Sequence, residues 1–266
     1  MENTNKFQAL SKYFTNGVGK RVLEVGCGEG DLSAFLADHY DTVVAIDSDD
    51  ERVATAREKL KHYANASVIC ADGSRTGLES CTFDDVVVYR SLHFMENVPQ
   101  FFAEAGRLLR PGGRLLVINS PNFRLAATQD DEATSSTIND TFSAWCQDTF
   151  RDELEQYWSK STAENFNKYC DPSRNEKNSP FCDSVVFTGE SIQTVPLINL
   201  KTHIMDFTVA KKFEDLWGED SLEEEVRSLQ EKILQALDYE FHDLYFENID
   251  VSITRTFYTE IHAKPM

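Results

Sequence analysis

The residue types best suited to bind a ligand gather in a glycine-rich stretch near the start of this 266-residue chain. Glu24, an acidic residue, precedes glycines at positions 26, 28 and 30. Glycine has no Cβ, so the backbone at Gly26 and Gly28 can turn sharply and approach a ligand closely. The stretch lies between an apolar, strand-like segment and a helical pattern that Gly30 opens. We therefore expect Glu24, Gly26, Cys27, Gly28 and Gly30 to contact a bound cofactor.

The spacing of these glycines distinguishes a dinucleotide cofactor from one without a pyrophosphate. A dinucleotide-binding loop has the pattern G-x-G-x-x-G, which would require a third glycine at position 31. That position is Asp31, and its negative charge at the start of the helix would oppose a pyrophosphate. S-adenosyl-L-methionine has no phosphate and carries a sulfonium cation and a free amino group. The acidic loop suits such a cation, so the pattern favours this cofactor over a nicotinamide dinucleotide.

Two later acidic residues extend the same ligand site. Asp47, followed by Ser48, ends the second apolar strand, and its carboxylate can accept hydrogen bonds from ribose hydroxyls. The alternative is that Asp47 only caps the helix that begins near Asp49. Asp72 and Gly73 follow the third strand, where the carboxylate can accept from an adenine amino group and a backbone N–H can meet a ring nitrogen. The alternative there is an ordinary Asp-Gly turn.

Apolar strands and amphipathic helices alternate over the first 120 residues. Fully apolar strands between such helices indicate a parallel sheet covered on both faces, and right-handed crossovers then give an open, doubly wound sheet. Ligands bind beyond the carboxyl ends of the strands in such sheets. The Pro111-Gly112-Gly113 sequence is expected to end the last helix of this part. Strands are predicted at 21–25, 42–46, 66–70, 84–89 and 114–119, and helices at 3–14, 31–39, 49–60 and 97–109.

The second half of the chain has a different pattern. Residues 121–182 are polar and form a predicted helical insertion or lid, with an amphipathic stretch at Thr141–Trp158. Residues 183–266 complete the sheet with strands at Ser184–Val195 and Val251–His262. Helices are expected between these strands, at 197–216 and 219–238. The predicted organisation is therefore a core of residues 1–120, the insertion, and this completion of the sheet.

The motifs together resemble class I S-adenosylmethionine-dependent methyltransferases over about residues 15–120. The residues that carry the resemblance are Glu24–Gly30, Asp47, Asp72, Phe83–Val87 and Leu108–Gly113. It implies an α/β, Rossmann-like, doubly wound sheet of seven mostly parallel strands, in which the last strand is antiparallel and pairs with strand six in a hairpin. It also implies an enzyme with S-adenosyl-L-methionine as cofactor. A weaker similarity to the trans-aconitate methyltransferase-like group lacks the tryptophan-containing helix of that group around Met205–Phe213.

The segment after the fourth strand is the expected place of the chemistry. It lacks the Asn/Asp-Pro-Pro-Tyr/Phe element of resembling enzymes that methylate nucleic-acid bases and glutamine amides, which argues for a small-molecule acceptor. In similar enzymes a histidine here faces the methyl group, so His93 is the candidate acid, base or substrate-orienting residue. Its unperturbed pKa suits proton transfer near neutrality, and the alternative is a histidine satisfied by the backbone. Arg90 and Ser91 are assigned to the cofactor, although Arg90 can equally bind a substrate acid or pair with a neighbouring acid.

Residues beyond the fifth strand are expected to reach the acceptor. Trp145 belongs to an aromatic set that can line an apolar lid, and the alternative is that this set is a helix core. The predicted substrate-binding residues are His93, Asn119, Asn122, Phe123, Arg124 and Trp145. We expect methyl transfer to the oxygen of a carboxylate or hydroxyl, or to the nitrogen of an amine, by in-line displacement. The alternative functions are a cofactor-binding regulatory protein or non-methylating enzyme on the same fold, and a nicotinamide oxidoreductase.

Composition excludes several classes of partner. The chain has 26 basic and 45 acidic residues, and its net charge of −19 repels phosphate backbones and anionic membranes. The six cysteines form no C-x-x-C pair, so no metal site is expected. The first ten residues are polar and lack the pattern of a leader peptide. We expect a cytoplasmic monomer or homodimer that binds neither nucleic acid nor membrane.

Overall fold

A computed structural model describes residues 5–14, 19–128, 132–150, 160–165, 181, 183–205, 208–239 and 248–265. The chain divides into two compact units. The first contains Met1–Pro121, Ser161–Gly189 and Phe257–Met266, and the second contains Asn122–Lys160 and Glu190–Thr256. Each unit has its own core and is described by itself.

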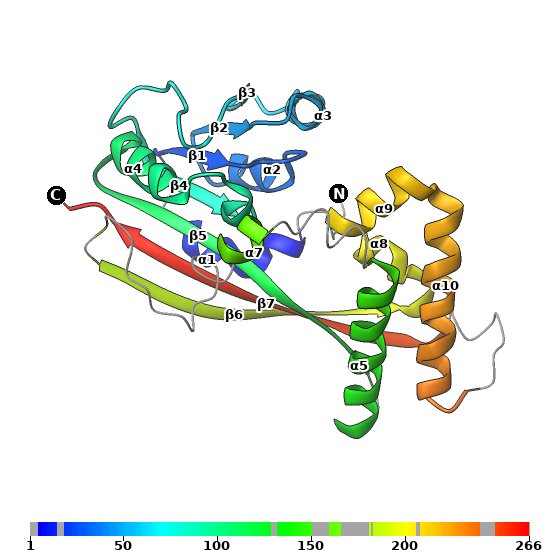
Figure 1. Ribbon diagram of the computed structural model, residues 1–266. Coiled ribbons are helices and arrows are strands. Elements are labelled where there is room, and N and C mark those ends of the chain that lie inside the picture. The colour runs from blue at the N-terminus through cyan, green and yellow to red at the C-terminus, as the bar shows by residue number, and fades with distance from the viewer. Residues whose placement is uncertain are drawn as a thin grey trace. The chain divides into compact units, whose positions relative to one another are not determined.

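Seven strands form one sheet in the order β3-β2-β1-β4-β5-β7-β6 (Figure 1). They are β1 (Arg21–Val25), β2 (Thr42–Asp47), β3 (Ala66–Cys70), β4 (Phe83–Tyr89), β5 (Leu109–Ala127), β6 (Asp183–Pro196) and β7 (Asp250–Ala263). The pairs β1–β2, β2–β3, β1–β4 and β4–β5 are parallel. The seven-stranded, mostly parallel sheet with added antiparallel strands confirms the predicted fold class. The strand order reverses between β1 and β4, which is where doubly wound sheets bind ligands.

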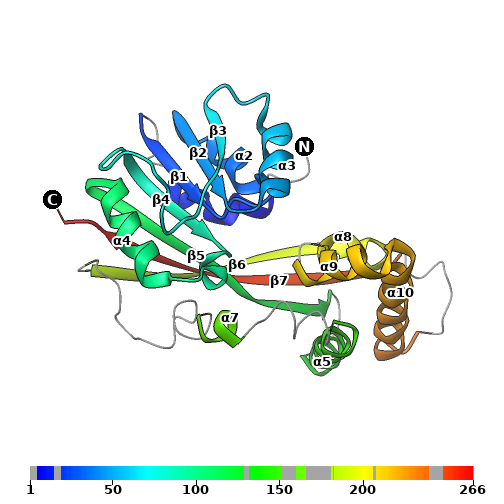
Figure 2. The ribbon, with the colours of Figure 1, turned by 45° about the horizontal axis from the view of Figure 1, so that its top comes forward.

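Helices cover both faces of the parallel part of the sheet in the first unit (Figure 2). Successive side chains of a strand point to opposite faces, and the core divides accordingly. Leu23 and Val25 pack with Phe101 of α4 (Val98–Leu108), whereas Val22 packs with Leu32 of α2 (Asp31–Ala37). The helical elements are η1 (Asn5–Leu10), α1 (Ser11–Phe14), α2 (Asp31–Ala37), α3 (Asp50–Leu60), η2 (Leu92–Phe94) and α4 (Val98–Leu108). The short helix α7 (Lys160–Asn165) comes later in the chain.

The second unit has a separate apolar core between helices and parts of the long strands. Its helical elements are α5 (Glu132–Thr149), η4 (Leu197–Asn199), α8 (Leu200–Ile204), α9 (Thr208–Trp217) and α10 (Glu219–Ala236). In Figure 1, α5 and α10 lie side by side, and Trp145 packs with Leu229 in the core. The helix α5 begins before the predicted Thr141, and residues 151–159, which include Tyr157 and Trp158, lie outside the described residues. No helix in the described part of the chain is both long and apolar enough to cross a membrane.

The prediction for the Pro111-Gly112-Gly113 sequence was wrong. The strand β5 begins at Leu109, so Gly112 and Gly113 lie within it and do not separate helix from strand. Gly112 N–H donates to Lys264 O at 3.1 Å, and Lys264 N–H donates to Gly113 O at 2.9 Å, so pairing with the far end of the chain extends the strand. Cys70, the last residue of β3, is exposed, because the outer face of β3 is open at this edge of the sheet.

A buried ion pair joins β4 to β5 inside the first unit. Arg114 Nε donates to Asp85 Oδ1 at 2.8 Å and Nη2 donates to Oδ2 at 2.7 Å. Tyr40 donates its hydroxyl to Asp85 Oδ2 at 2.7 Å, and Asp85 is fully buried. The neighbouring Asp84 instead pairs with Arg110 near the surface, at 3.1 Å. The two adjacent acids of the Phe83–Val87 motif therefore have different environments, and only the Asp85 carboxylate is fully buried.

Candidate cofactor and acceptor site

The strand register brings the predicted cofactor residues to one edge of the sheet. Val25 of β1 lies opposite Ile46 and Val88, and Asp47 of β2 lies opposite Cys70. Because these strands are parallel, the residues that follow them share an edge. The predicted residues at this edge are Gly26, Asp47, Ser48, Asp72, Gly73, Arg90 and Ser91. Asn119 lies within β5 at the same level, because its neighbour Ile118 pairs with Tyr89.

The glycine loop has the backbone that the sequence pattern predicts. Gly26, Gly28 and Gly30 have φ angles of +73°, +53° and +84°, in the left-handed region that favours glycine. The N–H groups of Gly26 and Cys27 donate to Ile46 O at 2.8 and 2.9 Å, which holds the loop against β2. A Cβ at Gly26 would lie 2.4 Å from Ser91 Oγ, so the loop also presses against the segment after β4. Ser91 Oγ donates to Val25 O at 2.9 Å and fixes this contact.

Asp47 ties the glycine loop to the end of β2. Its Oδ2 accepts from Gly28 N–H at 2.8 Å, and its Oδ1 accepts from Asp49 N–H at 3.1 Å. Asp49, not Asp47, caps α3, because the Asp49 side chain accepts from the N–H groups of Glu51 and Arg52. The helix-cap alternative for Asp47 is therefore excluded. A carboxylate has about four acceptor positions, so Asp47 keeps capacity for two hydroxyl donors.

Glu24 lies beneath the loop and is only 2% exposed. Its carboxylate accepts a hydrogen bond from Ser33 Oγ of α2. Burial is the main cause that raises the pKa of Glu24 to about 8, and the Ser33 bond opposes this effect. Glu24 is thus largely protonated at neutral pH, and a nearby cation would favour its ionised form. Asp31, whose charge was expected to repel a pyrophosphate, pairs with Lys59 at 2.5 Å, which offsets part of that charge.

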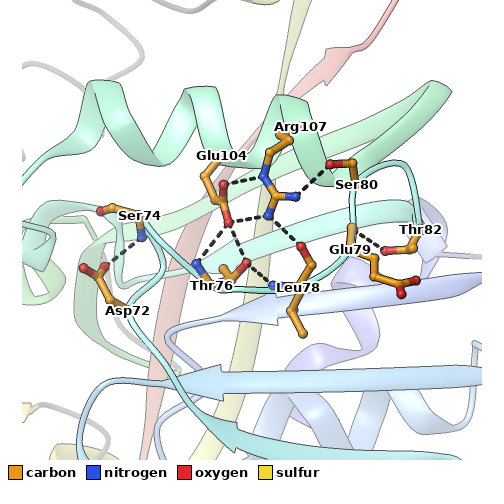
Figure 3. Close-up of polar contacts among 9 residues, drawn as sticks. All are labelled: Asp72, Ser74, Thr76, Leu78, Glu79, Ser80, Thr82, Glu104 and Arg107. Carbon is orange, nitrogen blue, oxygen red and sulfur yellow. Dashed lines mark hydrogen bonds and ion pairs between the residues drawn. The ribbon is translucent and has the colours of Figure 1, made fainter.

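The Asp72-Gly73 turn is well defined. Ser74 N–H donates to Asp72 Oδ1 at 2.7 Å (Figure 3). Arg75 N–H donates to Asp72 O at 3.0 Å. A Cβ on Gly73 would lie 2.5 Å from Val25 Cγ1, so glycine is needed where the turn packs against the end of β1. The Asp-Gly turn that the sequence suggests is therefore present. The turn leaves Asp72 exposed, so it does not exclude the predicted ligand role.

His93 follows β4 in η2 and is 7% exposed. Burial, and then the charge of Arg90, lower the pKa of His93 to about 4, so the imidazole is neutral at physiological pH. The unperturbed pKa, which suits proton transfer near neutrality, therefore does not apply to His93 in the folded protein. Arg90 has a φ of +53°, an uncommon backbone conformation for a residue with a side chain. Such conformations concentrate at functional sites, which agrees with the predicted place of the chemistry.

The predicted acceptor residues fall into different units. Asn119 is buried in the first unit, and the side chain of Asn122 lies outside the described residues. Phe123 and Trp145 belong to the core of the second unit, where Trp145 Nε1 donates to Glu225 O at 3.0 Å. Trp145 is 2% exposed, which favours the core alternative over an apolar lid.

Two further side chains are Arg124, which was predicted to contact the acceptor, and Asn165, which was not. Arg124 is exposed and pairs with Glu190 at 3.3 Å in the second unit. Asn165 of α7 was missed by the sequence reasoning, and its Nδ2 donates to Met95 O at 2.9 Å and approaches His93 O at 3.5 Å. Nothing in the local sequence around Asn165 marks it, because its partners lie about 70 residues away.

Comparisons with known proteins agree with this geometry. Residues 23–117 match a family described as a methyltransferase domain. An uncharacterized methyltransferase of Mycobacterium tuberculosis is 36% identical over 107 residues, which cover 39% of this chain and 53% of the relative. The 2-phytyl-1,4-naphtoquinone methyltransferase of Thermosynechococcus vestitus is 30% identical over 114 residues, which cover 42% of this chain and 51% of the relative. A solved methyltransferase structure from Anaeromyxobacter dehalogenans has 14% identity and a TM-score of 0.68 over 97% of this chain and 96% of that chain, which shows a shared fold.

Residues 23–117 are therefore a class I S-adenosylmethionine-dependent methyltransferase domain, the catalytic domain of an enzyme family whose cofactor is S-adenosylmethionine. The residues present fit this cofactor. Within 4 Å, a Cβ at Gly28 would meet only the Arg52 guanidinium among the described atoms, so the backbone is open to a ligand there. Asp47 ends β2 and Asp72 follows β3, so their carboxylates lie at the ends of neighbouring parallel strands, whereas the Glu24 carboxyl is buried within β1 beneath the loop. The chain spans about half the length of the curated relatives it matches.

Proposed function

We propose that this protein transfers the methyl group of S-adenosylmethionine to a small-molecule acceptor by in-line displacement. The acceptor atom is the oxygen of a carboxylate or hydroxyl, or the nitrogen of an amine. The observation that carries the proposal is the bond from Gly28 N–H to Asp47 Oδ2, at 2.8 Å, which holds the glycine loop after β1 beside the carboxylate that we assign to the ribose hydroxyls. The alternative is a cofactor-binding regulatory protein or a non-methylating enzyme on the same fold.

Each residue at the edge has a proposed role in holding the cofactor. Asp47, with Ser48 beside it, accepts from the ribose hydroxyls, and Asp72 accepts from the adenine amino group. Glu24 and the loop from Gly26 to Gly30 face the methionine end, where the buried carboxyl offsets positive charge. When bound, S-adenosylmethionine supplies a methyl carbon activated by its sulfonium. The chain contributes orientation and exclusion of water.

His93 is proposed to orient the acceptor. Because its pKa is about 4, the neutral imidazole can accept or donate a hydrogen bond but is a weak base at neutral pH. The Arg90 charge that helps to lower this pKa also disfavours a cationic acceptor next to His93. Acceptors that are anionic or neutral when they react therefore fit the site best. Asn119, which belongs to the same unit as His93, remains a predicted acceptor contact.

An acceptor panel tests the proposed activity. Purified protein with S-adenosylmethionine is incubated with carboxylic acids, phenols, quinols and amines, and release of S-adenosylhomocysteine is measured. Quinols are included because the T. vestitus relative is named for a naphthoquinone. We expect turnover with an acid, phenol or quinol, and its loss in the His93→Ala variant with cofactor binding retained. Cofactor binding without turnover across the panel would favour the regulatory alternative.

Replacing Asp47 should weaken cofactor binding. In Asp47→Asn the side chain keeps its shape and can still accept from Gly28 N–H, but it loses the charge that strengthens bonds from ribose hydroxyls. We expect the dissociation constant for S-adenosylhomocysteine to rise at least tenfold by calorimetry, which is about 1.4 kcal/mol. The matched control is Asp50→Asn, on an exposed residue in the first turn of α3. Equal affinities for wild type and Asp47→Asn would exclude the ribose role.

His93 should make stability depend on pH. Its pKa rises from about 4 when folded to the ordinary 6.5 when unfolded, so the unfolded chain binds more protons between these values. Stability from the neutral, buried imidazole is present above about pH 6.5 and is lost as the pH falls toward 4. Urea unfolding from pH 7.5 to 4.5 should therefore show a steeper loss of stability for wild type than for His93→Gln. The exposed His62→Gln is the control, and parallel curves for His93→Gln and wild type would contradict the buried, neutral state.

A further inference from the structure

The loop between β3 and β4, residues 71–82, is held by two charged side chains of α4 (Figure 3). Glu104 Oε1 accepts from Thr76 N–H at 3.0 Å and from Thr76 Oγ1 at 2.6 Å. Arg107 donates to Leu78 O at 2.7 Å and to Ser80 Oγ at 2.8 Å. These bonds hold the middle of a loop that has no helix or extended strand of its own. The loop therefore takes its shape from α4.

Glu104 and Arg107 also hold each other. Arg107 Nε donates to Glu104 Oε2 at 2.8 Å, and Nη2 donates to Oε1 at 2.8 Å. The bond from Arg107 is the main cause that lowers the pKa of Glu104 to about 2, and the bonds from Thr76 act in the same direction. Glu104 is thus ionised at any pH at which the protein would work. Hydrogen bonds to an ionised group are about twice as strong as neutral ones, so this pair can fix the loop.

The loop starts at the turn that we assign to the adenine of the cofactor. Asp72 and Gly73 are its second and third residues, and Thr76 follows after two more. Gly73 packs so tightly against Val25 that a Cβ there would lie 2.5 Å from Val25 Cγ1. The turn is therefore fixed on one side by β1 and on the other by Thr76, which Glu104 holds. Movement at Thr76 would be transmitted to Asp72 through only three intervening residues.

We propose that Glu104 and Arg107 are positioning residues, which hold Asp72 and Gly73 in the arrangement that recognises adenine. The proposal rests on the proposed function, since it requires a cofactor with adenine at this turn. A loop that is ordered before binding loses less conformational entropy when the ligand binds. Loss of the Glu104–Arg107 pair should therefore reduce affinity. It should also reduce discrimination at the adenine 6-position, because Asp72 would no longer be held against that position.

The test compares S-adenosylhomocysteine with S-inosylhomocysteine, which has an oxygen in place of the adenine 6-amino group. Both dissociation constants are measured by calorimetry for wild type, Glu104→Gln and Arg107→Ala. We expect wild type to prefer S-adenosylhomocysteine, and each variant to bind it about tenfold more weakly with a smaller preference. The matched control is Glu58→Gln, which removes one partner of an exposed i,i+3 pair with Lys61 that touches no loop residue among the described contacts.

The preference between the two ligands separates positioning from general stability. A variant that binds both ligands more weakly by the same factor would overturn the proposal, because a destabilised fold acts on both alike. Unchanged binding in Glu104→Gln would overturn it too, as would a wild type that binds both ligands equally. If wild type binds neither ligand, the proposed function itself fails. Amide hydrogen exchange should support the positioning role by showing faster exchange at 74–80 in Glu104→Gln than in Glu58→Gln.

Discussion

Gly26→Ala should nearly abolish cofactor binding. The added Cβ would lie 2.4 Å from Ser91 Oγ and 2.5 Å from Ser91 Cβ, and the residue would keep a φ of +73° that alanine rarely adopts. Ser91 cannot turn away easily, because the clash includes its Cβ, and its Oγ also donates to Val25 O. We expect S-adenosylhomocysteine to bind about 100-fold more weakly by calorimetry, as the loop and the segment after β4 must separate.

Two further variants separate the clash from the backbone strain. Gly19 has a φ of +79°, and a Cβ added there would meet no described atom within 4 Å. Gly19→Ala should therefore lower the free energy of unfolding by about 1 kcal/mol and leave cofactor binding unchanged. The double variant Gly26→Ala/Ser91→Gly removes both clashing atoms and should recover much of the lost affinity. Binding by Gly26→Ala as tight as that of wild type would show that the glycine loop does not need the observed contact.

Arg114→Leu should cause the largest loss of stability. The change leaves the Asp85 carboxylate, whose side chain is 1% exposed, without the guanidinium that neutralises it. Removing one partner of a buried ion pair costs about 3–5 kcal/mol, because the remaining charge stays in a medium of low polarity. We expect a loss of this size in the free energy of unfolding, measured by urea denaturation and circular dichroism.

The adjacent acid supplies the control for this prediction. The side chains of Arg110 and Asp84 are 44% and 20% exposed. Arg110→Leu breaks this ion pair and should lower the free energy of unfolding by only about 0–1 kcal/mol. Asp84 also keeps its bond from Arg21 N–H at 2.8 Å. A loss below about 1 kcal/mol in Arg114→Leu would mean that water or Tyr40 compensates Asp85, and that the buried pair does not hold β4 to β5.

The parallel part of the fold could be predicted because its signals are local. Strands predicted at 21–25, 42–46, 66–70 and 84–89 match β1 to β4 to within one residue at each end. Apolar runs, the Asp49 cap and the positive-φ glycines each follow from neighbouring residues in the chain. The same logic led to the prediction that Asp47 lies beside the glycine loop, since parallel strands end at a common edge.

The remaining features depend on contacts between distant parts of the chain. The extension of β5 through Gly112 and Gly113 requires pairing with Lys264, and a Pro-Gly-Gly sequence by itself indicates a break. The low pKa of His93 follows from burial that no local pattern displays. The Glu104–Arg107 pair looks like an ordinary surface pair at i,i+3 spacing, and only the folded loop shows that it holds Thr76 and Leu78.

Calorimetric titration of the wild-type protein with S-adenosylhomocysteine tests the assignment of the cofactor site. NADH is titrated in parallel, because a dinucleotide is the alternative ligand for a glycine-rich loop. We expect saturable binding of one S-adenosylhomocysteine per chain, with NADH bound at least 100-fold more weakly, a difference of about 2.7 kcal/mol. Absence of S-adenosylhomocysteine binding by a folded protein, or tighter binding of NADH, would contradict the assignment of the edge formed by Gly26, Asp47 and Asp72.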